Sequence, residues 1–200
     1  MRKLLLTTAA VAAAIAGAVA GETDFGTFTD TRDGQTYKTV TIGKQTWMAQ
    51  NLNYQTKRGS WCYKDKADSC KKYGRLYDWK TATTVCPKGW KLPSREDWDR
   101  LVETAGGKEI AGKRLKARRG WNDNCNGTDD YGFSALPCGD RFPDGSFRGT
   151  GYYCYWWTTV EHDYSGDAFY WSMGCSHDNA NEGHYYKSNG RSVRCVADRP

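Results

Sequence analysis

The sequence predicts an α+β fold for one exported domain, and three observations carry this prediction. Helical patterns occur between residues 74 and 105, whereas short strand patterns dominate after residue 110. This segregation is typical of α+β domains rather than of alternating βαβ units. Eight cysteines all follow residue 60, and their even number indicates disulfides. The 180 residues after a predicted export signal suit a single domain with a substantial core.

The first twenty residues have the features of that export signal. Arg2 and Lys3 precede an apolar run over residues 4–20, which ends in the small-residue arrangement Ala18-Val19-Ala20. Cleavage after Ala20 is expected, which predicts a secreted or cell-surface protein with no membrane span after cleavage. A signal anchor is the alternative, since the run approaches the roughly 17 apolar residues that a short spanning helix needs.

The charge of the exported part does not indicate nucleic-acid binding. The whole chain has 29 Lys and Arg against 23 Asp and Glu, and loss of residues 1–20 would leave 27 against 23. The densest basic runs, residues 64–75 and 113–119, are interrupted or mixed with acidic residues, unlike the concentrated basic faces of nucleic-acid domains. We therefore expect no nucleic-acid partner.

All eight cysteines lie in the exported part, where an oxidising compartment would join them as four disulfides. Their spacing favours one pairing. Local bridges are predicted for Cys62–Cys70, Cys125–Cys138 and Cys154–Cys175, which leaves Cys86–Cys195 as the long bridge. A zinc site is the alternative, but no two cysteines stand in C-x-x-C spacing.

The domain is expected to span residues 30–200 and to begin with a β-hairpin. Residues 21–29 are small and polar apart from Phe25 and Phe28, and they are interpreted as a short leader. Residues 37–42 are β-branched with period two, Gly43-Lys44 makes a turn, and residues 45–48 return as the second strand. A polar loop that contains the Cys62–Cys70 bridge follows.

Two helices are predicted on either side of residues 86–93. Residues 74–84 place Leu76, Trp79 and Ala82 at helical spacing. Ser94 is expected to cap the second helix with Asp97 as its capping-box partner, and Gly106-Gly107 to end it. Short strands are expected at residues 90–92, 133–136, 155–159, 169–173 and 192–196, with loop-forming residues between them.

Six motifs follow one another along residues 30–198: DGQTYKTVTIGKQTWMAQNLNY, SWCY, KYGRLYDW, CPKGWKLPSREDW, NGTDDYGFSALP and RSVRCV. This succession resembles the Fibrobacter succinogenes major paralogous domain family. The resemblance implies a C-type-lectin-like fold, with two helices packed on a small, twisted antiparallel sheet and with long irregular loops. It also implies a distant architectural relation to the formylglycine-generating enzymes and a location at the cell surface, but no reaction.

An oxygen-rich segment, residues 123–130, could wrap a calcium ion with carboxylates and carbonyl groups. It lacks EF-hand spacing, and the alternative is an Asx-rich turn whose side chains bond their own backbone. Trp121-Asn122-Asp123 spells the WND motif of calcium-dependent lectins, but the EPN or QPD motif that precedes it there is absent. No other cofactor is expected. The candidate calcium ligands are Asp123, Asn124, Asn126, Asp129 and Asp130.

The later loops are rich in aromatic residues, which could stack on sugar rings or anchor a protein partner. Because alternate residues of a strand point in opposite directions, at least half of these residues are expected in the core. Those expected to be exposed and to bind a ligand are Tyr152, Tyr153, Tyr164, Tyr185 and Tyr186.

These features predict a non-catalytic binding module that recognises a polysaccharide or a surface protein through a loop face over residues 120–190. His162, His177 and His184 each lie near acidic residues, but the sequence places no serine or free cysteine as a nucleophile. One alternative is an enzyme resembling the formylglycine-generating group, which would need free thiols such as Cys175 or Cys195. Another is a structural component of the cell envelope.

Overall fold

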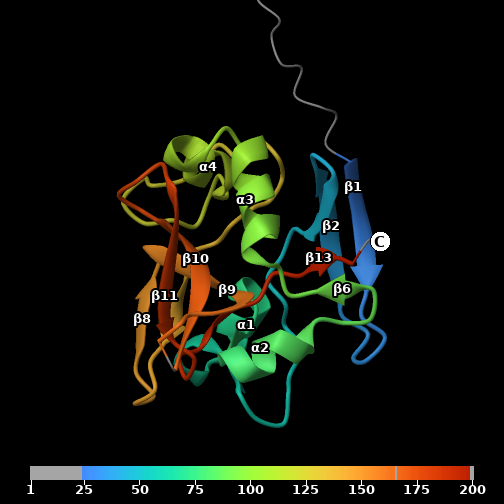
Figure 1. Cartoon of the computed structure of the whole chain (residues 1–200), viewed down its shortest axis with the longest axis vertical. Coiled ribbons are helices and arrows are strands. Elements are labelled where there is room, and N and C mark those ends of the chain that lie inside the picture. Colours follow the sequence, from blue (N-terminus) through green and yellow to red (C-terminus); the bar gives the residue numbers. More distant parts are fainter. Residues whose placement is uncertain (1–23, 165, 199–200) are drawn as a thin grey trace, which may run out of the picture.

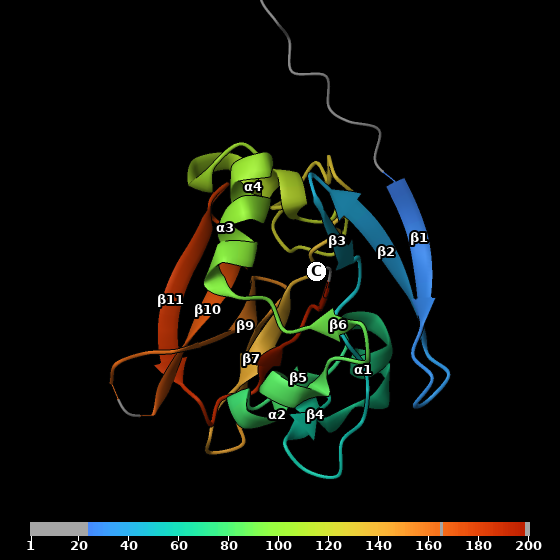
Figure 2. The same cartoon turned by 45° about the vertical axis from the view of Figure 1, so that its right-hand side comes forward.

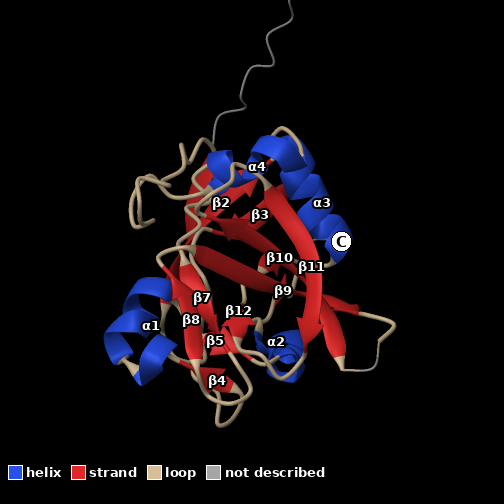
Figure 3. Ribbon diagram, turned by 90° about the vertical axis from the view of Figure 1, so that its left-hand side faces the viewer, coloured by secondary structure: helices blue, strands red, loops and turns tan. Residues whose placement is uncertain are grey.

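A computed structural model describes residues 24–164 and 166–198, and its mixed helix and strand content confirms the α+β prediction. The predicted export signal lies outside the described residues. Figure 1 shows β1, β2, β6 and β13 on one side of the molecule and β8 to β11 on the other. Helices α3 and α4 lie at one end of these strands, and α1 and α2 lie at the opposite end (Figures 1 and 3).

The first sheet is antiparallel, with its strands in the order β1-β2-β3-β13-β6. Figure 2 shows β1, β2 and β3 side by side. The predicted hairpin is confirmed as β2 (Thr36–Ile42) and β3 (Gln45–Met48). The leader expected over residues 21–29 is wrong from residue 24 onward, because β1 (Asp24–Thr29) pairs with β2 along its whole length. β6 (Trp90–Lys91) and β13 (Val196–Ala197) complete the sheet.

The second sheet has the order β11-β10-β9-β12-β5-β4. Outside this path, β7 pairs with β9 and β8 pairs with β7. β7 and β12 run parallel to β9, so the second sheet is mixed, whereas an antiparallel sheet was expected. The strand expected at residues 133–136 is reduced to one isolated bridge between Lys116 and Ala135. The bounds of the strands are β4 Ser60–Trp61, β5 Leu76–Tyr77, β7 Cys138–Arg141, β8 Phe147–Thr150, β9 Tyr153–Glu161, β10 Asp167–Gly174, β11 Ala180–Tyr186 and β12 Arg191–Ser192.

The strand predicted at residues 192–196 is divided between the two sheets. β12 pairs with β5 and β9 in the second sheet, and β13 pairs with β3 and β6 in the first. Cys195 lies between them and forms its disulfide with Cys86. The C-terminal segment therefore connects both sheets and is itself bonded to the end of α2.

Four α-helices occur in the described part of the chain, whereas the sequence predicted two: α1 (Ala67–Tyr73), α2 (Trp79–Val85), α3 (Arg95–Thr104) and α4 (Lys108–Leu115). The helix predicted from residue 74 begins only at Trp79, because the Asp78 carboxylate accepts a hydrogen bond from the Thr81 amide and residues 76–77 belong to β5. Gly112 weakens the helical signal of α4. A side chain at Gly112 would overlap the Asn179 carbonyl group, so the glycine permits close packing there. None of these helices is long and apolar enough to cross a membrane.

The predicted capping box of α3 is confirmed. The Ser94 hydroxyl accepts from the Asp97 amide at 3.1 Å, and the Asp97 carboxylate accepts from the Ser94 amide at 3.0 Å. The same carboxylate accepts from Arg100 at 2.9 Å and lies 3.3 Å from the Lys91 ammonium. Burial alone would raise the pKa of Asp97, but these hydrogen bonds and cations outweigh it and lower the pKa.

We expect Asp97→Asn to lower the free energy of unfolding by about 1.5–3 kcal/mol at pH 7, because hydrogen bonds to a buried carboxylate are lost or weakened. A lowered pKa stabilises the fold above the unfolded pKa of about 3.9, and this contribution is lost as the pH falls through the folded value. Urea unfolding at pH 7 and below pH 3 should therefore show a deficit that shrinks in acid. A deficit that is equal at both pH values would contradict the role of the charge.

Two buried aromatic clusters lie on opposite faces of β9. Trp156 belongs to the cluster around Trp98, and Trp157 belongs to the cluster around Tyr77. The Trp157 indole donates to the Tyr77 carbonyl at 2.8 Å. Because neighbouring residues of a strand point to opposite faces, burial of both tryptophans means that the middle of β9 is covered on both sides.

All eight cysteines form disulfides, which confirms the prediction from their even number. Cys62–Cys70 and Cys86–Cys195 pair as predicted. The predictions of Cys125–Cys138 and Cys154–Cys175 are wrong, because the bridges are Cys125–Cys175 and Cys138–Cys154. The reason is strand order: β7 lies parallel to β9 with Gly139 opposite Cys154, which brings Cys138 beside Cys154.

Candidate functional site

One face of β9 and β10, with the end of β11, carries a row of tyrosines. We term Tyr153, Tyr155, Tyr170 and Tyr185 the tyrosine face. The rings of Tyr153 and Tyr155 are stacked with centroids 6.1 Å apart, and Tyr155 meets Tyr170 edge-to-face at 5.6 Å. Strand alternation turns these side chains away from the opposite face, where Trp156 and Trp171 pack on Trp98 of α3.

Two glycines make room for these rings. Gly183 lies opposite Tyr170 in the β10–β11 register, and a Cβ atom there would lie 2.6 Å from the Tyr170 hydroxyl oxygen. Gly174 lies opposite Tyr153, and a Cβ atom there would lie 3.0 Å from the ring. The rings therefore lie across the neighbouring strand, where a larger residue would push them away.

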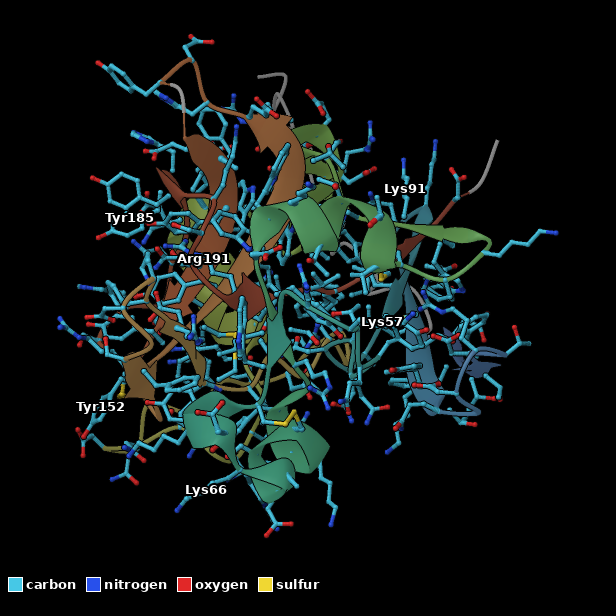
Figure 4. The ribbon with its side chains drawn as sticks, turned by 90° about the horizontal axis from the view of Figure 1, so that it is seen from below. Lys57, Lys66, Lys91, Tyr152, Tyr185 and Arg191 are labelled. Atoms are coloured by element: carbon cyan, nitrogen blue, oxygen red, sulfur yellow. A yellow bond between two sulfur atoms is a disulfide. The ribbon has the colours of Figure 1, made fainter. Side chains whose placement is uncertain are left out.

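The guanidinium group of Arg191 in β12 packs against three rings of the tyrosine face. Its guanidinium carbon lies 3.6 Å from the centroid of Tyr170, 4.7 Å from Tyr155 and 5.4 Å from Tyr185. The residue is only 2% exposed, and its Nε and Nη1 have no hydrogen-bond partner in the described part of the chain. Burial lowers the pKa of Arg191, although Tyr170 and Asp140 act against this effect. The Arg191 guanidinium therefore interacts mainly with the faces of the tyrosine rings. Figure 4 shows Arg191 and Tyr185 on the same side of the molecule.

The ionisable groups beneath the face are buried as well. Asp140 of β7 is buried, and burial raises its pKa while Arg191 and Arg148 lower it. Burial also raises the pKa of Tyr155 to about 12, with a contribution from the negative charge of Asp140. Tyr155 is therefore a neutral phenol at physiological pH. The face offers aromatic surfaces and a neutral hydroxyl group, a combination suited to neutral polyols.

The five tyrosines predicted to be exposed are all exposed, by 37% to 71%. Tyr153 and Tyr185 belong to the tyrosine face, and Tyr186 contacts Tyr185 with ring centroids 5.0 Å apart. Tyr164 instead stacks on His162, whose ring lies 3.7 Å from that of His184. Tyr152 lies farther along the same side of the molecule (Figure 4). The five residues therefore do not form one surface.

Three residues of this site were not predicted: Tyr155, Tyr170 and Arg191. Tyr155 had a usable signal, since it is two residues from Tyr153 and period two places both on one face of a strand. Tyr170 had no such signal, because its place beside Tyr155 depends on the pairing of β9 with β10. Arg191 reaches the face from β12, which no local pattern places parallel to β9.

Side-chain oxygens of two candidate calcium ligands, Asn126 and Asp129, accept hydrogen bonds from neighbouring residues. The Asn126 side-chain oxygen accepts from the Trp121 amide at 3.1 Å. Both carboxylate oxygens of Asp129 accept from Ser134, at 2.8 and 2.6 Å. Asp123 and Asn124 are exposed and have positive φ angles, as is common for such residues in turns. Residues 24–164 and 166–198 contain no group of three or more His, Cys, Asp or Glu side chains placed to hold a metal ion. Calcium binding by this segment stays a prediction.

Two histidines and two cysteines considered for catalysis have partners in the structure. His184 Nδ1 lies 2.9 Å from the Asp167 carboxylate, and His162 Nδ1 accepts from the Tyr164 amide. Cys175 and Cys195, which a formylglycine-generating reaction would need as thiols, are both in disulfides.

The comparisons with known proteins identify a family. No curated protein and no solved structure matches this chain. The model of the Fibrobacter succinogenes major domain matches residues 40–197, which include β2 to β13 almost completely. Because this match covers well over half of the chain, the protein belongs to the Fibrobacter succinogenes major domain family.

Proposed function

We propose that this protein is an exported, non-catalytic binding module of C-type-lectin-like architecture, and that its tyrosine face binds a polysaccharide. The observation that carries the proposal is the row of tyrosine rings supported by the buried Arg191. The sequence of residues 1–20 supports export, and four disulfides suit an oxidising environment.

The chemistry of the face favours a sugar chain over a folded protein partner. Tyr153 and Tyr155 lie nearly parallel with ring centroids 6.1 Å apart, and Tyr170 meets Tyr155 edge-to-face at 5.6 Å, so aromatic rings line this face in two orientations. Aromatic faces stack on the C–H faces of sugars. Gly174 and Gly183 leave room for the rings of Tyr153 and Tyr170, and Arg191 packs on the Tyr170 ring, so ordering of this ring on binding would cost little side-chain entropy. A preformed face of this kind suits a repetitive ligand.

The long disulfide between the middle and the end of the chain supports the proposed lectin-like architecture. The Cys86–Cys195 disulfide joins the end of α2 to the C-terminal segment that connects the two sheets. α2 and α3 lie on either side of residues 86–93 in the sequence. Long irregular segments, such as residues 116–137, are then displayed on a cross-linked frame.

We expect Tyr153→Ala/Tyr185→Ala to weaken polysaccharide binding by about tenfold, which corresponds to about 1.4 kcal/mol, because two exposed ring surfaces are removed. Cellulose pull-down and affinity electrophoresis in gels with soluble hemicelluloses would measure the effect. Tyr152→Ala/Tyr164→Ala is the matched control, since both residues are exposed and neither belongs to the tyrosine face.

An equal loss in both double variants would show that the tyrosine face is not the site. Retention by none of the polysaccharides, together with specific capture of a secreted protein that the Tyr153→Ala/Tyr185→Ala variant loses, would replace the sugar by a protein partner.

A further inference from the structure

One end of the molecule carries an excess of positive charge. Residues 54–91, which include β4, α1, β5, α2 and β6, contain 10 Lys and Arg against 3 Asp and Glu. The rest of the chain contains 19 against 20, so the positive net charge of the protein comes from this one segment. α1 and α2 lie together at the end of the molecule opposite α3 and α4 (Figures 1 and 2).

The loops and helices of this segment are bonded to one another. The Cys62–Cys70 disulfide joins the residue before the short 3-10 turn to α1. The Asp78 amide donates to the Gly59 carbonyl at 3.1 Å, which holds the loop over residues 55–59 against the start of α2. Cations on these elements are therefore held on one surface by the fold itself.

Five cations at this end have side chains without a partner. Each is exposed, and none forms an ion pair with, or lies over an aromatic ring of, the residues that the structure describes. In contrast, Lys71 is paired with Asp68, and the Lys72 ammonium lies 4.8 Å from the centroid of Tyr73, so these two lysines are not counted. We term the five cations the basic end: Lys57, Arg58, Lys66, Lys80 and Lys88.

The cations of the basic end lie on the outer surface and come from several elements. They belong to the loop before β4, the start of α1, α2 and the turn before β6. The cavity between the β1–β2 hairpin, α1 and residues 118–136 is lined by none of them. In Figure 4, which views the molecule from this end, Lys57 and Lys66 lie well apart. A planar anionic surface can contact such separated cations at once, whereas a single polymer strand contacts only those along its path.

The tryptophans at this end already have partners within the protein. The Arg141 guanidinium carbon lies 4.3 Å from the centroid of Trp61, and the Lys187 ammonium lies 5.0 Å from that of Trp79. The Trp79 indole donates to the Thr158 carbonyl at 2.8 Å. Polysaccharides and single-stranded nucleic acids are bound largely by stacking on open aromatic faces. Positive charge is therefore what this end offers to a ligand.

We propose that the basic end binds an anionic phospholipid surface, with its five cations placed against the lipid phosphate groups. Each Lys or Arg near such a surface strengthens binding by about fivefold, so several together give stable attachment. The attachment is peripheral and needs no segment within the bilayer. Tyr152 and Tyr185 lie on the opposite side of this view from Lys57 (Figure 4), and the proposal does not depend on polysaccharide binding by the tyrosine face.

The test is sedimentation of the disulfide-bonded protein with vesicles made of equal parts phosphatidylglycerol and phosphatidylcholine. We expect Lys57→Glu/Lys66→Glu to lower the partition coefficient by at least about tenfold, because attraction becomes repulsion at two contacts.

Lys44→Glu/Lys108→Glu is the matched control, since it reverses the same number of charges at the opposite end. Lys44 follows Gly43, which lies against Thr104 of α3, and Lys108 begins α4. Because charges farther away than a Debye length are screened, this variant should stay within about twofold of the unaltered protein. The four lysines are exposed, so both variants should fold, and their thermal midpoints would verify this.

Further arms identify the kind of partner. Vesicles of phosphatidylcholine alone should bind at least about tenfold more weakly, and raising the salt from about 0.1 M to about 1 M should remove most of the binding. Dextran sulfate, at the same concentration of negative charge, represents a linear polyanion. Tighter binding of dextran sulfate than of the vesicles, equal losses in the two lysine variants, or no binding to phosphatidylglycerol would overturn the proposal. Tyr153→Ala/Tyr185→Ala should leave vesicle binding unchanged, which separates a failure here from a failure of the tyrosine face.

Discussion

Removal of the Cys86–Cys195 disulfide should lower the free energy of unfolding by about 4.7 kcal/mol. The two cysteines are 109 residues apart in sequence, and the entropy that a cross-link removes from the unfolded chain grows with the length of the closed loop. The bond also holds the segment that carries β12 and β13, so its loss frees the connection between the two sheets. Urea unfolding of Cys86→Ala/Cys195→Ala would measure the change.

The matched control is Cys62→Ala/Cys70→Ala, which removes a disulfide with a sequence separation of 8. The same entropy argument gives a loss of about 2–3 kcal/mol for so short a loop. The difference between the two variants isolates the effect of loop length, because each replaces one disulfide by two alanines. If the short bridge cost as much as the long one, the bond between Cys86 and Cys195 would not be the main restraint on the fold.

Trp98→Ala should cost about 3–5 kcal/mol of stability. Trp98 lies on the buried side of α3, is 0% exposed, and its ring contacts those of Trp47, Phe133 and Trp156 at 5.2 to 5.8 Å. It also stacks on Trp171 of β10 at 6.0 Å. Truncation removes a large apolar surface and leaves a cavity that the surrounding rigid rings cannot fill. Chemical unfolding monitored by circular dichroism would measure the loss.

Trp98→Phe provides the control for this prediction. The Trp98 indole nitrogen has no hydrogen-bond partner in the described part of the protein, so replacing the indole by a phenyl ring breaks no hydrogen bond there. We expect a loss of about 1–2 kcal/mol from the smaller ring. Equal effects of phenylalanine and alanine would mean that the size of the ring is not what stabilises this cluster.

Some elements could be predicted because their signals are local. The capping box of α3 needs only Ser94 and Asp97, three residues apart, and the hairpin needs only a turn between two alternating runs. α4 was missed because Gly107 and Gly112 read as loop residues, although Gly112 is required by packing against the Asn179 carbonyl. β1 was missed because its two apolar residues, Phe25 and Phe28, do not alternate with period two and its other residues are small or polar, as in some edge strands.

The sequence alone determined the family, the α+β class, the even set of disulfides and the exposure of the five tyrosines, because composition, motif order and residue periodicity are written along the chain. Only the tertiary structure decided that Cys138 bonds to Cys154 and that Tyr155, Tyr170 and Arg191 lie against one another. Local patterns specify which face of a strand is buried, but not which strand lies beside it. The disulfide and the ring contacts both depend on which strands pair with β9.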